Sequence, residues 1–359
     1  MDVFQSFYVL EDKILGKGSF GTVYLGKDVA NDKYVALKEI PKEIMNNKKR
    51  IELLYNEILI PSELKNEHLV KIFDKIELNN KKYIDFEFCN GGDLRRYLTF
   101  FKVFEEKYIQ YFMKQILNGL SALHSKNIIH HDIKPENVLV QLNPYTIKNK
   151  KKEKEKYEKI INDIMQLTSS EKDNNSNINI DGDYILQTLQ YSHLKLSDFG
   201  LSKYKEDNNQ KMRSGTELYM DPNIFRPDAN TFIIEEPKNE IWSIGIFSYE
   251  LLFGKRPFNS KRDIEKGIYI IDLKECKKIS KQFLSFLNMC LQRKQNSRPN
   301  IKELMLSEFI TNEYYNFEFI DENNLNEIKF PNKVYICNDD KIIKMNIDDD
   351  RSVNIEFDC

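Results

Sequence analysis

The sequence is poor in features that would mark several protein classes. Its 359 residues include only five cysteines, and their scattered spacing matches no metal site. Few cysteines without a pairing pattern favour a reducing compartment. No run reaches the ~18 apolar residues of a membrane helix, and the first residues lack the basic start and apolar core of a signal peptide. We therefore expect a cytoplasmic protein without a membrane span.

The chain also lacks an excess of charge of either sign. Its 54 Lys and Arg residues nearly balance its 56 Asp and Glu residues, for a net charge of −2. No broad positive field therefore indicates nucleic acid as a partner. Hydrophobic residues make up 41% of the chain, which is enough for the core of one large or two modest domains.

The periodicity of apolar residues divides the chain into a β-rich part and a helical part. In residues 51–61 the apolar positions Ile51, Leu54, Tyr55, Ile58 and Leu59 indicate one amphipathic helix, which Pro61 should end or kink. Helical patterns dominate from residue 105 to residue 310, including an almost wholly apolar stretch at 241–254 that predicts a buried central helix. Alternating or β-branched residues predict strands at 8–15, 22–27, 33–40, 70–78 and 82–88. We expect an α+β fold with a small β-rich lobe and a larger helical lobe.

Two segments fall outside this pattern. Residues 141–193 hold a lysine-rich charge run and a polar, Asn-rich stretch that bury too little apolar area to offset chain entropy, so we expect a mostly disordered insert. Residues 311–359 alternate enough for two or three short strands. These could pack on the large lobe, bind a partner or form a loose acidic tail.

A glycine-rich stretch, GKGSFGTV, follows the first predicted strand. Gly16, Gly18 and Gly21 match GxGxxG, a weak signal shared with dinucleotide-binding folds. In those folds a helix follows the glycines, whereas here a second strand follows. This favours a β-hairpin whose backbone N–H groups approach phosphate, with an ordinary glycine-rich hairpin as the alternative.

Charged residues follow at positions that suit phosphate and metal chemistry. Lys38 lies on an interior strand and needs a carboxylate partner, which Glu57 on the amphipathic helix can supply. The turn between two short apolar segments carries Asp132, Lys134 and Asn137. Asp198 comes directly after another strand, where a carboxylate can hold a divalent metal.

With these residues in this order, the chain resembles the eukaryotic protein kinase family over about residues 8–310. The resemblance rests on the glycine-rich stretch and on the further motifs VALK, HHDIKPEN, DFG, GTELYMDP, EIWSIG and SRPN. It implies a two-lobed protein kinase fold, with a small lobe at about 8–89, a large lobe at about 90–310 that contains the insert, and a C-terminal extension of unknown role at 311–359.

The resemblance implies ATP and Mg²⁺ as cofactors. It places adenine between Leu15, Val23, Ala36 and Leu139 with Phe86 behind it, base contacts at the Glu87 and Cys89 backbones, and ribose at Asp93. Lys38, fixed by Glu57, would hold the α- and β-phosphates, while Asn137 and Asp198 would hold the metal. The glycine-rich part of the implied ATP site is Gly16, Lys17, Gly18, Ser19, Phe20, Gly21 and Thr22.

The resemblance also implies a reaction. Asp132 would orient the acceptor hydroxyl and accept its proton, and Lys134 would steady the γ-phosphate. Lys134 and Thr216 match Ser/Thr rather than tyrosine kinases, so the expected partners are proteins with Ser or Thr acceptors, and the insert or the extension offers a place for a regulatory partner. An active enzyme is favoured over a pseudokinase scaffold because the polar groups are intact. A small-molecule kinase is disfavoured by GTELYMDP. The nearest likeness is to the autophagy-initiating kinases, with calcium/calmodulin-type and cell-cycle kinases close behind.

Three positions depart from the family pattern. His131 stands where an arginine usually precedes the catalytic acid, and this predicts activity without a strict need for phosphorylation of the activation segment. Asn223 replaces the glutamate of the motif APE, which pairs with an arginine, here Arg298, so we expect an uncharged amide contact. Glu240 replaces an aspartate with one methylene more. We expect these changes to affect the rigidity of the large lobe and not the catalytic groups.

Overall fold

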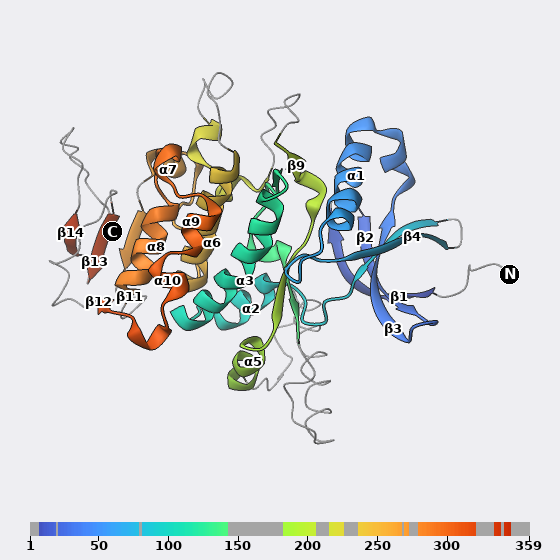
Figure 1. Cartoon of the computed structure of the whole chain (residues 1–359), viewed down its shortest axis with the longest axis horizontal. Helices are drawn as coiled ribbons and strands as arrows, with labels where there is room; N and C mark the ends of the chain where they lie inside the picture. Colours follow the sequence, from blue (N-terminus) through green and yellow to red (C-terminus); the bar gives the residue numbers. More distant parts are fainter. Residues whose placement is uncertain are drawn as a thin grey trace. The chain divides into compact units, whose positions relative to one another are not determined.

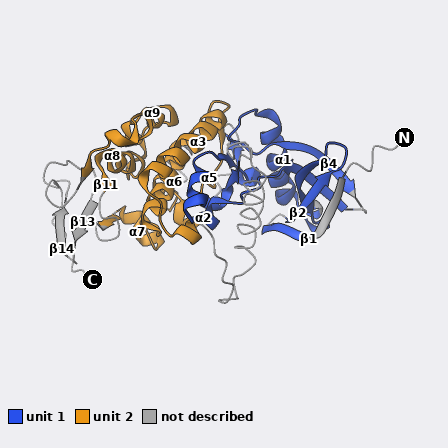
Figure 2. Cartoon of the chain, turned by 90° about the horizontal axis from the view of Figure 1, so that it is seen from below, with its two compact units in different colours: residues 1–97, 135–204 blue, residues 98–134, 205–359 orange. Residues whose placement is uncertain are grey.

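The structure, a computed structural model, describes residues 7–18, 21–78, 81–142, 182–205, 215–225, 236–267, 269–272, 279–320, 334–338 and 341–345. The chain forms two compact units (Figure 2). Unit 1 comprises Met1–Tyr97 and Pro135–Tyr204, and unit 2 comprises Leu98–Lys134 and Lys205–Cys359. Residues 90–97 and 135–204, which the predicted boundary assigns to the large lobe, therefore group with the β-sheet unit.

Unit 1 is built on a five-stranded antiparallel sheet in the order β1-β2-β3-β5-β4 (Figure 1). The predicted strands are all present, because β-branched and aromatic side chains alternate between the two faces of the sheet. Their bounds are β1 (Phe7–Gly18), β2 (Gly21–Asp28), β3 (Lys33–Ile40), β4 (Ile72–Leu78) and β5 (Lys81–Glu87).

One long helix, α1 (Lys48–Glu63), packs on this sheet, preceded by the short helix η1 (Lys42–Asn46). Leu54 of α1 joins Ile44 and Ile84 in a buried cluster. Asn47 caps the helix by accepting a hydrogen bond from the backbone N–H of Arg50. Pro61 lies inside the last turn rather than ending the helix, which continues for two more residues.

The predicted insert interrupts a hairpin of unit 1. β7 (Val138–Gln141) pairs with β8 (His193–Leu196) in antiparallel register, with Gln141 opposite His193. Residues 143–181, most of the insert, lie outside the described residues. For the last part of the insert the prediction of disorder is wrong. Residues 182–189 form the helix α5 (Gly182–Leu189), which buries Ile185 and Leu189 at positions i and i+4. The remaining elements of unit 1 are η2 (Pro135–Asn137), η4 (Phe199–Leu201) and β9 (Lys203–Tyr204), and α2 (Leu94–Phe101) spans the unit boundary.

Unit 2 is mainly helical, and α6 (Glu236–Phe253) is its buried central helix, as predicted. No helix among the described residues is long and apolar enough to span a bilayer. The other helices are α3 (Glu106–His124), α7 (Lys261–Lys266), α8 (Lys281–Cys290), α9 (Ile301–Met305), α10 (Glu308–Thr311), η5 (Glu217–Tyr219), η6 (Pro222–Phe225), η7 (Gln295–Ser297) and η8 (Tyr314–Asn316).

The C-terminal extension contributes strands to unit 2, which is one of the alternatives that the sequence left open. β12 (Phe319–Ile320) pairs with β11 (Ile279–Ser280). β13 (Val334–Asn338) pairs with β10 (Tyr269–Asp272) in parallel and with β14 (Lys341–Met345) in antiparallel register. The extension thus adds strands to segments on either side of residues 273–278. Among the described residues, unit 2 also contains the strand β6 (Ile128–Ile129).

Candidate active site

The glycine-rich hairpin of unit 1 has glycines of two kinds. Gly21 has a φ of +141°, and a Cβ there would lie 2.1 Å from the Glu39 carbonyl oxygen, so the fold itself requires glycine. A Cβ on Gly16 or Gly18 would meet no atom within 4 Å among the described residues. The fold leaves open space beside these two backbones, as an approaching phosphate needs. Ser19 and Phe20, also predicted for the ATP site, lie outside the described residues.

Three of the residues predicted to surround adenine, Val23, Ala36 and Phe86, belong to one face of the unit 1 sheet. Val23 lies opposite Lys38, and Ala36 lies opposite Phe86, so these four side chains share a face. Leu139 of β7 forms an isolated bridge with Asp93, next to the start of α2. Val23, Leu139 and Leu15 are only partly buried, which leaves apolar surface available to a flat ligand.

Of the next two predicted residues, Glu87 ends β5 and Cys89 lies two residues beyond it. The Glu87 carboxylate accepts hydrogen bonds from the backbone N–H of Lys71 and forms an ion pair with Lys195 at 3.2 Å. Burial raises the pKa of the Cys89 thiol to about 12, so it is not a reactive thiol. Neither side chain is required by the predicted contacts, which use the backbone of this segment.

Lys38 of β3 pairs with Glu57 of α1, as the sequence predicted. The ammonium donates to Oε1 of the carboxylate, and the two residues are only 8% and 4% exposed. Burial raises the pKa of the Glu57 carboxyl, Lys38 opposes that shift, and the nearby Asp198 reinforces it. The pair and Asp198 are therefore close enough to interact electrostatically within unit 1.

Asn137 and Asp198 meet although 61 residues separate them. The hairpin of β7 and β8 brings their backbones together, and the Asn137 carbonyl accepts hydrogen bonds from the N–H (2.9 Å) and hydroxyl (3.1 Å) of Ser197. Asp198 adopts a left-handed conformation, with φ of 63°. Its buried Oδ1 has no hydrogen-bond partner among the described residues. An unpartnered carboxylate oxygen suits Mg²⁺, which prefers oxygen ligands.

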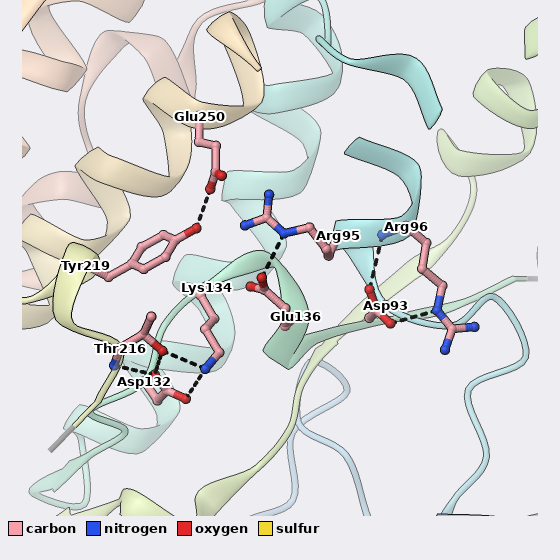
Figure 3. Close-up of polar contacts among 9 residues, drawn as sticks. All are labelled: Asp93, Arg95, Arg96, Asp132, Lys134, Glu136, Thr216, Tyr219 and Glu250. Atoms are coloured by element: carbon pink, nitrogen blue, oxygen red, sulfur yellow. Dashed lines mark hydrogen bonds and ion pairs between the residues drawn. The ribbon is translucent and has the colours of Figure 1, made fainter. Parts of the chain in front are cut away.

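Asp93 is already partly engaged by its own helix. Its carboxylate accepts hydrogen bonds from the side chain (2.8 Å) and the backbone N–H (3.1 Å) of Arg96 (Figure 3). Arg96 also donates to the Leu15 carbonyl at 3.2 Å, which ties the end of β1 to the start of α2. A ribose at Asp93 would share the carboxylate with this guanidinium.

Unit 2 holds the predicted acid Asp132 in a network of three residues (Figure 3). Lys134 donates to Oδ2 of Asp132 at 2.7 Å and to the Thr216 hydroxyl at 2.7 Å. Thr216 donates its hydroxyl (2.8 Å) and its backbone N–H (3.0 Å) to Oδ1. Burial alone would raise the pKa of Asp132, but the hydrogen bonds and charge of Lys134, with Thr216, bring it below its ordinary value. The acid is therefore an ionised carboxylate near neutral pH.

The backbone before Asp132 is held by Glu240 of α6. One carboxylate oxygen accepts the backbone N–H groups of His130 and His131 at 2.8 Å each, and the other contacts His124 at 2.6 Å. His131 has a φ of 69°, an uncommon conformation for a residue with a side chain. The extra methylene of Glu240 thus keeps the contact to the loop that carries Asp132.

The expected contact between Asn223 and Arg298 is wrong. Arg298 pairs instead with Asp221, and both side chains are fully buried. Asn223 donates its side-chain amide (2.8 Å) and its backbone N–H (2.6 Å) to Asp221. A carboxylate is a far stronger partner for a buried guanidinium than an amide, so the charged group two residues upstream takes the position.

Comparison with known proteins fixes the family to which these features belong. The family model described as "Protein kinase domain" matches residues 9–310. The chain is a member of the protein kinase family. Its matched region covers both units and contains each motif of the resemblance, and the five-stranded sheet and helical unit are the two parts that the family fold implies.

Named relatives show moderate similarity to this kinase chain. It is 29% identical over 315 residues to serine/threonine-protein kinase ULK3 of Xenopus laevis, covering 86% of this chain and 56% of that protein. It is 28% identical over 311 residues to calcium-dependent protein kinase 5 of Plasmodium berghei (85% and 46%) and 28% identical over 301 residues to an Aurora kinase of Schizosaccharomyces pombe (83% and 70%). The chain thus spans about half the length of the first two.

Several residues of this kinase site were not found from the sequence. Asp221 and Arg96 each form an ion pair described above, and His124 contacts Glu240. Tyr219 was also not found from the sequence; its hydroxyl donates a hydrogen bond to the buried Glu250 (Figure 3). The only sequence signal was the acid of "MDPN", two residues before Asn223.

Proposed function

We propose that this protein is an ATP-dependent serine/threonine protein kinase that transfers the γ-phosphate of ATP to Ser or Thr hydroxyls of proteins. Unit 1 supplies the residues for the nucleotide, and unit 2 supplies those for the acceptor. Family membership supports phosphotransfer from ATP. The Ser/Thr specificity is our inference from Thr216 and Lys134 together with the relatives.

Nucleotide binding would rely on residues of unit 1 alone. Gly16 and Gly18 would let backbone N–H groups approach the phosphates, and the Lys38 ammonium, held by Glu57, would bind the α- and β-phosphates. Asn137 and Asp198 would hold Mg²⁺, whose contribution when bound is neutralisation of phosphate charge.

Phosphotransfer would rely on the ionised carboxylate of Asp132. Asp132 would orient the acceptor hydroxyl and accept its proton as the hydroxyl oxygen forms a bond to the γ-phosphorus. The bond from that phosphorus to the β-bridging oxygen breaks, and ADP leaves. Lys134, which already contacts Asp132, would balance the charge that develops on the transferred group.

The observation that carries the Ser/Thr proposal is the contact of Thr216 with both Asp132 and Lys134. The hydroxyl of Thr216 fixes the acid through the segment 215–225, so the acceptor meets a carboxylate that is already oriented. This favours an active kinase over the alternative, a pseudokinase scaffold that binds nucleotide or partners without transfer.

The test is phosphate transfer to three peptide libraries that differ only in the central acceptor, Ser, Thr or Tyr. With ATP and Mg²⁺ we expect phosphate on the Ser and Thr libraries and none on the Tyr library, read by mass spectrometry. Transfer to Tyr alone would contradict the specificity. Nucleotide binding without transfer to any library would favour the pseudokinase.

Finer assignments remain proposals. An autophagy-initiation-like role, a cytoplasmic location and a regulatory partner at the insert or the C-terminal extension rest on the resemblance and on the strands that the extension adds to unit 2. The ULK, calcium-dependent and Aurora relatives have similar identities and so do not separate the subfamilies. Screening the same peptide libraries for residues preferred around the acceptor would do so.

A further inference from the structure

Arg298 is a fully buried cation at the base of α6. Its guanidinium lies 5.0 Å from the ring of Trp242 and donates to the Gln292 carbonyl (2.7 Å) and the Lys238 carbonyl (3.0 Å). Burial lowers the pKa of Arg298, and the Asp221 carboxylate opposes that shift. A buried arginine of this kind requires an anionic partner, because an uncompensated charge inside a protein is strongly destabilising.

That partner lies on the segment 215–225, which also touches the catalytic acid. The segment is fixed at three places. Thr216 contacts Asp132 at its start, and Ser243 of α6 donates to the Tyr219 carbonyl at 2.8 Å in its middle. The ion pair of Asp221 with Arg298 fixes its end.

Asn223 supports this ion pair rather than replacing it. Its two hydrogen bonds go to Oδ1 of Asp221, while Arg298 donates to Oδ2. Each oxygen of the buried carboxylate thus has a donor. Relative to the family motif APE, the acid stands two positions earlier, at Asp221, and the amide of Asn223 stands where the motif has its glutamate.

We propose that Asp221 is a positioning residue for phosphotransfer. Arg298 holds it through the ion pair, and Asn223 supports it through two hydrogen bonds. It holds the segment 215–225 so that Thr216 keeps Asp132 oriented. The role is thus carried by a carboxylate that the motif has moved by two residues. This inference rests on the proposed function, because the acceptor reaction is what the segment would position.

The experiment returns the carboxylate from position 221 to position 223, where the family motif has it. Four proteins are compared: wild type, Asp221→Ala, Asp221→Ala/Asn223→Glu and Asn223→Ala. The double variant restores the order Ala-Pro-Glu. Asn223→Ala removes the side-chain hydrogen bond to Asp221 but keeps the ion pair. Each is measured for melting temperature, affinity for an ATP analogue and kcat/KM for an acceptor peptide per folded molecule. The affinity reports on unit 1, which the substitutions leave untouched.

We expect Asp221→Ala to melt about 10 °C lower and to lose at least tenfold in kcat/KM, with analogue affinity within twofold of wild type. The double variant should recover most of both losses, and Asn223→Ala should show a smaller loss. An Asp221→Ala protein equal to wild type would overturn the proposal. A double variant that recovers neither melting temperature nor kcat/KM relative to Asp221→Ala would also overturn the proposal. This holds even if Asp221→Ala fails to fold.

Two further outcomes separate the claims. A double variant that recovers melting temperature but not kcat/KM would show a structural role only, and would overturn positioning. If wild type transfers no phosphate to any peptide, the proposed kinase activity fails. The melting temperatures of the four proteins then still show whether the ion pair of Asp221 with Arg298 stabilises the fold.

Discussion

The two units keep the family pattern in different ways. In unit 1 the residues proposed to bind nucleotide and metal match the family motifs, and Lys38 has the partner that was expected. In unit 2 the contacts of the family are kept but the residues are changed: Asp221 replaces a carboxylate two positions away, and Glu240 replaces a shorter acid.

This difference has a physical reason. Residues that bind ATP face a ligand of fixed shape and charge, so no compensating change is available on the other side. Contacts such as Asp221 with Arg298 join two parts of the same chain, and both sides can change together. We therefore expect substitutions to be compensated more readily in the scaffold of unit 2 than at the charged residues of unit 1.

A large effect should follow from removing Lys38, the lysine of unit 1 that is proposed to bind phosphate. Lys38→Met removes the phosphate-binding ammonium and leaves Glu57 buried without its partner, so we expect transfer to fall by about 10²–10³-fold. The matched control is Lys81→Met, since Lys81 pairs with Glu39 at an exposed site on the same sheet and should be nearly silent. Steady-state kinetics on an acceptor peptide measures both. Equal losses in the two variants would deny Lys38 a special role.

A smaller effect should follow from removing the acid that holds the catalytic loop in unit 2. Glu240→Ala leaves the buried backbone N–H groups of His130 and His131 without their acceptor, at a cost of about 1–3 kcal/mol each. We expect a melting temperature lower by about 5–10 °C. Glu240→Asp, the residue of the family pattern, should retain most of the stability. A Glu240→Ala protein that melts like wild type would show that the loop needs no such support.

A buried acid of unit 1, Asp85, should give a pH-dependent effect. Asp85 of β5 is 1% exposed, and burial beside Asp28 and Asp74, opposed by Lys33, raises its pKa to about 7. Oδ1 of Asp85 has no hydrogen-bond partner among the described residues. The folded state therefore binds the proton more tightly than the unfolded state, and wild-type stability falls as pH rises from about 4 to 7.

Replacing Asp85 by Asn removes this titration. The melting temperature of Asp85→Asn minus that of wild type should grow from pH 5 to pH 7, by up to about 5 °C since each pH unit contributes at most about 1.4 kcal/mol, and then level off. A difference independent of pH would contradict the raised pKa.

The smallest effect should come from shortening the insert. Replacing residues 149–181 by a short Gly/Ser linker keeps α5 and the hairpin of β7 and β8. Because closure entropy changes slowly with loop length, the melting temperature should change by no more than about 3 °C. A fall of 10 °C or more, or loss of nucleotide binding, would mean that the insert contributes to the stability of unit 1.

The sequence predicted the features that depend on local pattern or on charge at a fixed position. Alternation and helical periodicity located all five strands of the sheet, α1 and α6, and the charged motif residues identified Lys38, Glu57 and Asp132. The family motifs also singled out Thr216, which contacts Asp132 in the structure.

What the sequence did not reveal depends on tertiary contact or on competing local bonds. Asp221 and Arg298 lie 77 residues apart, and only the fold decides that this acid, not Asn223, meets the guanidinium. Arg96 competes for Asp93 through a bond three residues along α2. The helix α5 follows a polar stretch and is short, so Ile185 and Leu189 gave too weak a pattern to separate it from the insert.

The most direct test of the account is a comparison of Asp132→Asn with Asp198→Asn, because the two acids belong to different units. For each variant, transfer to a Ser/Thr peptide and Mg²⁺-dependent affinity for an ATP analogue are measured. Asp132→Asn should bind nucleotide like wild type and lose about 10²–10⁴-fold in transfer, since an amide does not accept the hydroxyl proton. Asp198→Asn should lose both. Near wild-type turnover by Asp132→Asn would contradict the account.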